Sequence, residues 1–427
     1  MITILGSGLS GLSAAYHLRE KYVLLEKEVE AGGLCRSVTH GEYTFDIAPH
    51  ILFTRDVYAE NLFRRLLEGN LLTHIREAYI FLENTYVKYP FEANLHPLPK
   101  HVIEECIKGV IERPLFEPHN FREWIMTTFG EGIAKYYMVP YNEKIWKYDL
   151  SKMNIEWVAG RVPAPSVNEM EKGAIGELEK DFGPNAQFWY PEYDGIAALP
   201  NSLAQLVEVE PASEVVEVRP SSDRVETIYR CNGALTKNVS DYVFSSVPLP
   251  ELVKMIGDAP TDVVKASKSL VYNSLICIDV GVSRAHISDK HWLYFPERDV
   301  IFNRISFPMN LSPNTTPKNK SSVLVEVTYR GERPDMEQTK TKVIEDLVKT
   351  GILKDDDDLD LVEISDFKYA YVIYDLDHRR NVGVIHRYLE DNRIIPIGRF
   401  GEWEYYNMDK AMLSGKRAAD RYNEGLL

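Results

Sequence analysis

The sequence contains few of the residues that would build a disulfide framework, a metal site or a membrane anchor. Only four cysteines occur in 427 residues, and Cys35, Cys106, Cys231 and Cys277 are scattered without CxxC spacing, so we expect neither a zinc site nor disulfides. No stretch approaches eighteen uninterrupted apolar residues, and no membrane span is expected. Basic residues number 49 against 64 acidic ones, and the net charge of −15 argues against nucleic acid as a partner.

Core-forming residues are plentiful, since 44% of the chain is hydrophobic and 26% is charged. This composition supports two or three domains with substantial cores. Strand-like sequence begins at residue 2, which leaves no room for a signal peptide, and we expect a cytoplasmic protein. The acidic run at residues 355–358 lacks the alternating spacing and the glycine of a calcium loop. It is expected to be a solvated loop, so no metal is predicted.

The first 26 residues match a complete dinucleotide-binding unit. An apolar strand at residues 2–5 is followed at once by Gly6, Gly8 and Gly11 in GxGxxG spacing, then by a helix and a second strand that ends at Glu26. The first glycine permits a tight turn, the second lets the backbone approach a pyrophosphate, and the third lets helix and strand pack closely. The acidic residue is placed to accept hydrogen bonds from a ribose. The unit therefore predicts a bound dinucleotide at the start of the helix.

A second glycine pair indicates that the dinucleotide is FAD. Residues 31–37 place Gly33 and Arg36 shortly after Glu26, so a second stretch of backbone and a cation can approach the same pyrophosphate. This run resembles the glycine–arginine signature of the amine oxidase, protoporphyrinogen oxidase and UDP-galactopyranose mutase flavoproteins. The acid at the end of the strand also argues against NADP, because it would repel a 2′-phosphate.

The remaining pattern predicts an α/β fold with a discontinuous Rossmann-like FAD-binding domain of the glutathione-reductase type. Helical periodicity dominates the middle of the chain, with a break expected at Gly130, and period-two alternation returns near residue 208. We therefore expect an inserted helical domain and an antiparallel β-sheet domain. The predicted boundaries are 1–70, 195–268 and 380–427 for the FAD domain, 98–194 for the helical substrate domain, and 71–97 and 269–379 for the sheet domain.

Five further stretches resemble one family, in order along the chain. They are 89–94 (YPFEAN), 129–146, 152–162, 292–297 followed by Arg304, and 398–409 (GRFGEWEYYNMD). The family is the UDP-galactopyranose mutases, which are FAD-dependent relatives of the amine oxidases and protoporphyrinogen oxidases. Residues 50–54 add a histidine that lies beside the flavin ring in that family.

The resemblance assigns roles to individual residues. The expected cofactor-binding set is Gly6, Gly8, Gly11, Glu26, Gly33, Arg36, His50, Gly398, Arg399, Asn407 and Met408. The expected substrate-binding set is Tyr89, Asn94, Asn142, Trp146, Arg161, Asn185, Tyr294, Arg304, Tyr374 and Tyr405. Within these sets we expect His50, Arg161 and Arg304 to be catalytic. The guanidinium fork of each arginine suits bidentate contact with a diphosphate.

The activity implied by the resemblance is an isomerase that interconverts the pyranose and furanose forms of a UDP-sugar, as in polysaccharide biosynthesis. The N5 atom of the reduced flavin attacks the anomeric carbon, expels UDP, and the sugar recloses before UDP reattaches. NAD(P)H is the expected external reductant, and a homo-oligomer is left open.

Two departures from the family pattern keep other functions open. Leu311 replaces a tyrosine seven residues after Arg304, and residues 371–377 resemble a YPVYD segment of protoporphyrinogen-oxidase-like proteins instead of the YPTP-like turn of the mutases. The alternatives are a FAD-dependent oxidoreductase of the amine oxidase or protoporphyrinogen oxidase type, and a catalytically silent flavin-binding protein.

Overall fold

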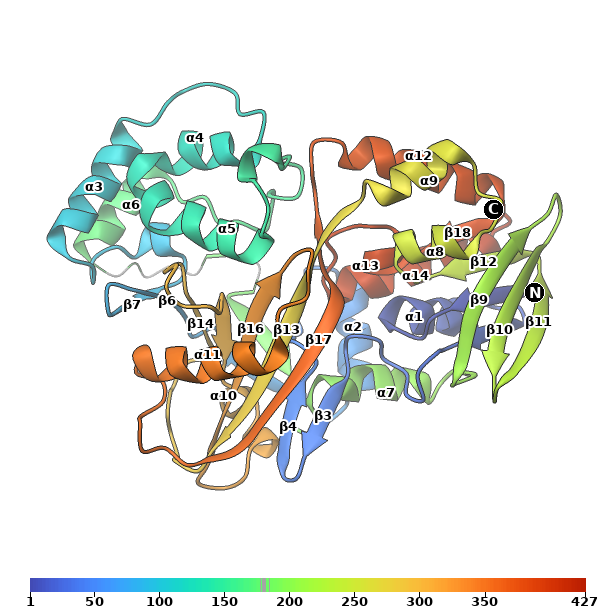
Figure 1. Ribbon diagram of the computed structural model, residues 1–427, viewed down its shortest axis with the longest axis horizontal. Helices are drawn as coiled ribbons and strands as arrows, with labels where there is room; N and C mark the ends of the chain where they lie inside the picture. The colour runs from blue at the N-terminus through green and yellow to red at the C-terminus, as the bar shows by residue number, and fades with distance from the viewer. Residues whose placement is uncertain (177, 179–181, 184) are drawn as a thin grey trace.

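The computed structural model describes residues 1–427 except 177, 179–181 and 184. The molecule is elongated, with the helices α3 (Lys100–Ile111) to α6 (Val167–Ile175) and a large sheet at one end, and the strands β9 (Ser213–Pro220) to β11 (Ala234–Ser240) at the other (Figure 1). Both chain termini lie at the β9–β11 end.

The glycine motif opens a four-stranded parallel sheet, as the sequence predicts. Its strand order is β18-β12-β1-β2, so segments from the start, the middle and the end of the chain lie side by side. Helix α1 packs on α14, where a Cβ on Gly415 would collide with the Ser10 carbonyl oxygen. The elements are β1 (Ile2–Leu5), α1 (Leu9–His17), β2 (Tyr22–Leu25), β12 (Tyr242–Ser245), β18 (Ile394–Pro396) and α14 (Met408–Asn423).

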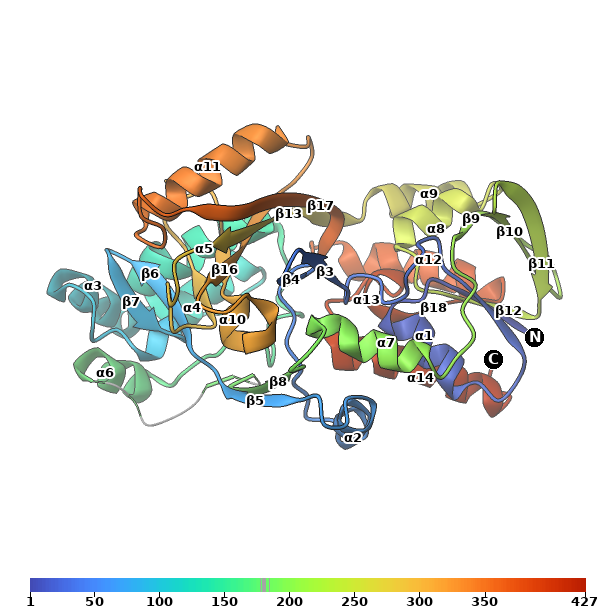
Figure 2. The same ribbon diagram turned by 90° about the horizontal axis from the view of Figure 1, so that it is seen from below.

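The central sheet has seven strands in the order β17-β13-β16-β15-β14-β6-β7. It is antiparallel as expected, except that β14 runs parallel to β6, so the sheet is mixed. Helix α11 (Met336–Lys349) covers one face through Val343 and Leu347 (Figure 2). The strands are β6 (Ala78–Leu82), β7 (Thr85–Lys88), β13 (Val271–Val282), β14 (Trp292–Tyr294), β15 (Arg304–Ser306), β16 (Ser321–Tyr329) and β17 (Leu359–Ile373).

The helical part consists of α3 (Lys100–Ile111), α4 (Phe121–Ile133), α5 (Val139–Trp146) and α6 (Val167–Ile175), with a π-helical turn from Ala134 to Met138 between α4 and α5. Gly130 has φ 72° inside α4, which is the predicted break. A Cβ at this glycine would meet the Gly109 carbonyl of α3, so the break lets two helices approach closely.

Two long elements have no counterpart in the sequence interpretation, namely β17 and α12 (His378–Asp391). Strands β9 (Ser213–Pro220), β10 (Val225–Cys231) and β11 (Ala234–Ser240) form a separate three-stranded sheet. The remaining elements are β3 (Ser37–His40), β4 (Tyr43–Asp46), α2 (Val57–Leu66), β5 (Leu72–Ile75), β8 (Gln187–Tyr190), α7 (Ala198–Ala204), α8 (Leu249–Met255), α9 (Thr261–Lys268), α10 (Pro308–Leu311), α13 (Gly398–Gly401) and short 3₁₀ turns at Phe91–Ala93, Leu150–Lys152, Gly195–Ala197 and Pro313–Thr315. Among the described residues, none of the helices is long and apolar enough to cross a membrane.

Candidate active site

The glycines of the two motifs face each other at the start of α1. Gly8 caps the helix and forms a parallel bridge with Gly32, and the amide of Gly32 donates to the Ser7 carbonyl at 2.9 Å. Gly6 has φ 90°, a left-handed conformation that favours glycine. A Cβ built on Gly8 would meet only the Cα of Gly33, at 3.9 Å. The backbone around Gly8 is therefore open to close approach by a ligand.

Glu26 directly follows β2 beside this opening and is buried. Its Oε2 accepts the Ser7 amide at 2.7 Å and the Ser7 hydroxyl at 2.8 Å, and its Oε1 accepts the Glu28 amide at 3.0 Å. A carboxylate has about four acceptor positions, so roughly one remains for a hydroxyl donor. Arg36 uses its Nε to donate to the Gly33 carbonyl at 2.9 Å, which holds the second glycine turn.

The segment from Gly398 to Met408 joins the parallel sheet to the rest of the site. Gly398 has φ 74°, and its amide donates to the Ser414 hydroxyl at 2.7 Å. Arg399 is anchored by donation to the carbonyls of Tyr406 and Ala370 at 3.0 and 2.9 Å. Asn407 is the N-cap residue of α14 without a side-chain capping bond, and Met408 is buried.

Two arginines from distant segments enclose one tyrosine. The guanidinium carbons of Arg161 and Arg399 each lie 4.8 Å from the centroid of the Tyr405 ring. Arg161 also donates to the carbonyls of Tyr405 and Trp157. Cation–π contacts of this kind stabilise guanidinium groups that are partly removed from water.

The described residues include no charge partner for either of these two arginines. Within the described chain, neither forms an ion pair with a carboxylate, and the Nε of each is buried without a hydrogen-bond acceptor. Burial lowers the pKa of Arg399, and the nearby positive charge of Arg161 adds to this effect. A cation that is partly removed from water and has no charge partner is costly, so the site is suited to receive an anionic or electron-rich group.

Arg304 has different surroundings. It lies directly opposite Glu326 in the β15–β16 pairing, and its Nε and Nη2 donate to the two carboxylate oxygens of Glu326, the second at 2.8 Å. Glu326 is 0% exposed. Burial alone would lower the pKa of Arg304, but the Glu326 carboxylate raises it well above the ordinary value. Arg304 is thus a permanently charged group whose charge is largely neutralised within the protein.

Tyrosines line the wall next to Arg304. The Tyr294 ring centroid lies 5.6 Å from that of Tyr89 and 5.4 Å from that of Tyr141, and its hydroxyl accepts the Trp292 indole N–H at 2.9 Å. Arg76 lies over the Tyr89 ring at 4.6 Å and donates to Oδ1 of Asn185 at 2.7 Å. Asn185 is therefore placed behind Tyr89, where it orients Arg76.

His50 is half-buried on the turn predicted for it. Its Nδ1 lies 2.9 Å from the Ala48 carbonyl oxygen, so Nδ1 carries the proton and Nε2 is an acceptor. Burial lowers the pKa of His50 to about 4, and the charges of Arg399 and Arg304 contribute. The side chain is neutral at physiological pH, and it lies within the electrostatic reach of two site arginines.

Four predicted substrate residues make their polar contacts within the protein. The Asn94 amide donates to the Pro90 carbonyl at 3.0 Å. Asn142 donates to Met138 and accepts the indole N–H of Trp146 at 3.0 Å, and Trp146 packs edge-to-face on Tyr371 and Tyr405. The Tyr374 hydroxyl donates to Glu404 and accepts the Tyr405 amide. These side chains shape the site and orient its members.

Sequence reasoning missed three members of this cluster: Tyr141, Glu326 and Tyr371. Tyr371 lies within cation–π distance of Arg399, 5.3 Å from ring centroid to guanidinium carbon. Burial raises its pKa, while Arg304 and Arg399 lower it and Glu326 adds to the increase. No period-two pattern marks Tyr371 in the sequence, because the register of β17 against β13 shifts along the strand.

Leu311, the residue found in place of the family tyrosine, is 4% exposed and packs in an apolar cluster with Phe188, Tyr190 and Trp292.

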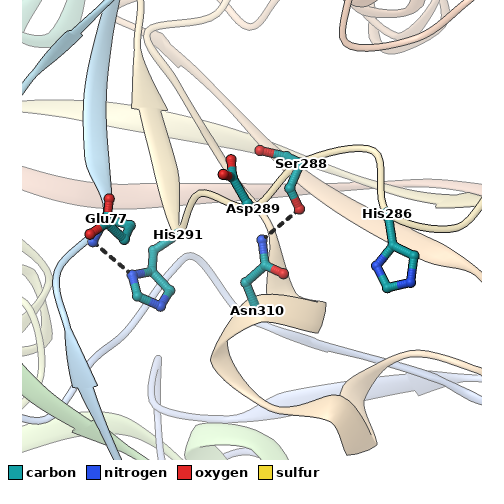
Figure 3. Close-up of a pocket in the computed structure, with 6 residues that line it drawn as sticks. All are labelled: Glu77, His286, Ser288, Asp289, His291 and Asn310. Atoms are coloured by element: carbon teal, nitrogen blue, oxygen red, sulfur yellow. Dashed lines mark hydrogen bonds between the residues drawn. The ribbon is translucent and has the colours of Figure 1, made fainter.

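A separate cavity of about 390 Å³ lies nearby, lined by Glu77, His286, Ser288, Asp289, His291 and Asn310 (Figure 3). His291 there accepts the Glu77 amide at 2.9 Å. In the described part of the chain, no group of three or more His, Cys, Asp or Glu residues is arranged to hold a metal ion.

The parallel sheet, the facing glycine turns and the partly buried arginine–tyrosine cluster together define a flavoenzyme with a Rossmann-like nucleotide-binding part. The family model of the flavin containing amine oxidoreductases matches residues 9–423, and the chain belongs to this family.

Solved structures agree with this assignment and extend it. The crystal structure of a reduced UDP-galactopyranose mutase is 26% identical, with a TM-score of 0.92 over 100% of this chain and 94% of that one. A fatty acid isomerase from P. acnes is 13% identical, with a TM-score of 0.67 over 99% of this chain and 98% of its own. A putrescine oxidase bound to putrescine is 15% identical, with a TM-score of 0.66 over the same shares. The last two show the fold alone.

Proposed function

We propose that the protein is a FAD-dependent mutase that interconverts the pyranose and furanose forms of a UDP-sugar. The observation that carries this proposal is the pair of partly buried guanidinium groups of Arg161 and Arg399, which have no carboxylate partner among the described residues, with Arg304 close to the same histidine as Arg399. A diphosphate brings two negative charges to such a site, whereas a cationic amine substrate would be repelled. The likeness to a reduced UDP-galactopyranose mutase supports a UDP-sugar in particular.

The residues present fit FAD. The space at Gly8, which a side chain would fill, suits the pyrophosphate, and Glu26 retains an acceptor position for a ribose hydroxyl. Gly6, Gly11, Gly33 and Arg36 would shape this end. His50, Gly398, Arg399, Asn407 and Met408 would hold the ring system. The reduced flavin would supply a nucleophilic nitrogen for covalent catalysis, with NAD(P)H as the source of electrons.

The side chains of the site would orient the nucleotide sugar and hold its leaving group. Arg161 has a free buried Nε beside Tyr405, and Arg304 has a nitrogen, Nη1, that Glu326 does not occupy. Together with the hydroxyls of Tyr294 and Tyr405, they would bind the diphosphate and stabilise it when it departs from the sugar. His50, neutral and with Nε2 as an acceptor, would take a hydrogen bond or a proton at that atom.

The rival function is oxidation of an anionic substrate by the same fold. We would incubate the purified yellow protein with UDP-galactopyranose and with UDP-galactofuranose, in air and under dithionite, and separate the nucleotide sugars by chromatography. Interconversion under dithionite alone supports the mutase. Substrate loss in air with release of hydrogen peroxide supports the oxidoreductase, and bound FAD without turnover of either sugar supports a silent flavoprotein.

A further inference from the structure

A buried ammonium group connects the helical part of the chain to the sheet. Lys144 lies in α5 between Asn142 and Trp146 and is 7% exposed. Its Nζ donates to three backbone carbonyls, those of Phe295 at 2.8 Å, Phe302 at 3.1 Å, and Glu297. An ammonium has three N–H donors and no acceptor, so all of its hydrogen-bonding capacity is used in one place.

The three carbonyls belong to a single segment, residues 295–303, which we call the β14–β15 connection. It contains no helix or strand of its own, and it begins directly after Tyr294 and ends directly before Arg304. Other elements also contact the connection. In α11, Oδ2 of Asp346 accepts the Ile301 amide at 2.8 Å and Lys349 pairs with Asp299 at 2.6 Å, and the Glu83 amide donates to Glu297 at 3.2 Å. Any shift of the connection would therefore move the two candidate site residues at its ends.

We propose that Lys144 is a positioning residue that fixes the β14–β15 connection against α5. It thereby sets the distance from Tyr294 and Arg304 on the sheet to the aromatic residues of α5, Tyr141 and Trp146. The proposal rests on the proposed function, in which Tyr294 and Arg304 hold the diphosphate. Lys144 itself acts through the connection and makes no contact with the ligand in this scheme.

The buried hydrogen bonds of Lys144 should contribute more than the exposed ion pair that also joins α5 to the β14–β15 connection. The ion pair between Arg298 and Glu143 also joins the connection to α5, at 2.7 Å, but the Arg298 side chain is three-quarters exposed, and such pairs contribute little. Removing the ammonium leaves three backbone carbonyls without their donor. Because a buried unpaired carbonyl is costly, the connection would turn toward water and carry its two ends with it.

The ionisation of Lys144 decides the conditions for a test. Burial lowers the pKa of Lys144 to about 7, and the charge of Lys147, the C-cap residue of α5, acts in the same direction. The carboxylates of Glu297 and Asp299 on the connection and Asp346 on α11 oppose the shift. Measurements at pH 6 keep the ammonium protonated in the wild-type protein.

The experiment compares Lys144→Met with a matched control, Thr328→Val, in the FAD-loaded protein. The Thr328 hydroxyl donates to the Lys144 carbonyl at 2.7 Å, so the control breaks a buried hydrogen bond to the same residue and leaves the connection in place. In Lys144→Met, we expect amide hydrogen exchange of residues 295–303 to rise by about tenfold or more, and the dissociation constant for UDP in the reduced protein to rise by about tenfold.

The FAD content of Lys144→Met should stay at the wild-type level. Thr328→Val should change the exchange rate and the UDP dissociation constant by less than about twofold. Lys144→Arg should recover most of the UDP affinity. Unchanged exchange in Lys144→Met would overturn the proposal, as would raised exchange with wild-type UDP affinity, or equal losses in the methionine and valine variants. If the wild-type protein itself does not bind UDP, the proposed function fails, and the exchange measurement still decides whether Lys144 holds the connection.

Discussion

Arg161 and Arg304 are both predicted phosphate ligands, yet the fold gives them opposite electrostatic surroundings. Arg161 donates to two carbonyls and lies on a tyrosine ring, with no carboxylate partner among the described residues. Arg304 is paired with a fully buried glutamate. A substitution of Arg161 therefore removes a ligand contact. The same substitution of Arg304 also leaves the buried charge of Glu326 unpaired.

We predict that Arg161→Met weakens UDP binding to the reduced protein by about 2–4 kcal/mol and leaves stability nearly unchanged. Arg304→Met should in addition lower the free energy of unfolding by about 3–5 kcal/mol, because Glu326 loses its partner. Calorimetric UDP titration and urea unfolding measure the two effects. The double variant Arg304→Met/Glu326→Gln should regain stability without regaining affinity, and equal unfolding losses for both single variants would contradict the assignment.

Glu92 lies in the YPFEAN stretch, and the structure gives this carboxyl an unusual setting. It is 1% exposed, and within the described chain its Oε2 has no hydrogen-bond partner. Burial raises the pKa of Glu92 to about 8 from its ordinary 4.5. The unfolded chain releases this proton more readily, so the group destabilises the fold progressively as pH rises from 4.5 to about 8.

Glu92→Gln should remove this penalty. We expect the variant to be more stable than the wild type at pH 8 by up to about 4 kcal/mol, with the difference vanishing toward pH 4.5. Urea unfolding across this pH range measures it. Glu104→Gln, a substitution of a largely exposed side chain on α3, is the control and should leave the pH profile unchanged. If the free energies of unfolding of Glu92→Gln and the wild type differed by the same amount at all pH values, Glu92 would not have a raised pKa in the folded protein.

At the scale of elements, the sequence predicted segments whose pattern is local. Strand β1, helix α1 and strand β2 follow from the glycine spacing and the flanking apolar residues, and the break in α4 follows from Gly130. Helix α12 was missed because it begins with a charged run and buries only a narrow apolar stripe. The Arg304–Glu326 pair was missed because it depends on the β15–β16 register, which a 22-residue separation does not reveal.

Substitutions of two glycines in the same motif, Gly8 and Gly11, should have different effects. A Cβ on Gly11 would collide with the Gly6 carbonyl oxygen, whereas a Cβ on Gly8 meets only Gly33 Cα at 3.9 Å. We predict that Gly8→Val folds but contains no FAD, because the side chain fills the space for the pyrophosphate. Gly11→Ala should instead give little soluble folded protein. Circular dichroism and flavin absorbance report the two properties.

Gly383→Ala is the control for these variants, since it adds a methyl group in open space on α12 and should keep both fold and flavin. A yellow Gly8→Val protein with stoichiometric FAD would place the pyrophosphate elsewhere.

At the scale of the whole molecule, the helical part is joined to the central sheet by contacts around the site. Trp146 of α5 packs on Tyr371 of β17, Asn273 of β13 donates to the Ile145 carbonyl at 2.6 Å, and the Asn154 amide donates to the Tyr374 carbonyl at 2.8 Å. One buried apolar cluster runs from β1 through the helices α3 and α4 to residue 403. The parts are therefore expected to lose their structure together.

We predict a single cooperative unfolding transition in which flavin release, far-ultraviolet circular dichroism and tryptophan fluorescence share one midpoint. Tryptophans report on both ends of the shared core, since Trp157 lies among the helical segments and Trp403 in the segment that follows α13. Asn273→Ala removes the donor to the Ile145 carbonyl, and should lower that common midpoint without splitting it, because the continuous core still couples the parts. Two separated transitions in the wild-type protein, with tryptophan fluorescence changing before flavin is released, would show that the helical part unfolds on its own and that the site is assembled from independently stable units.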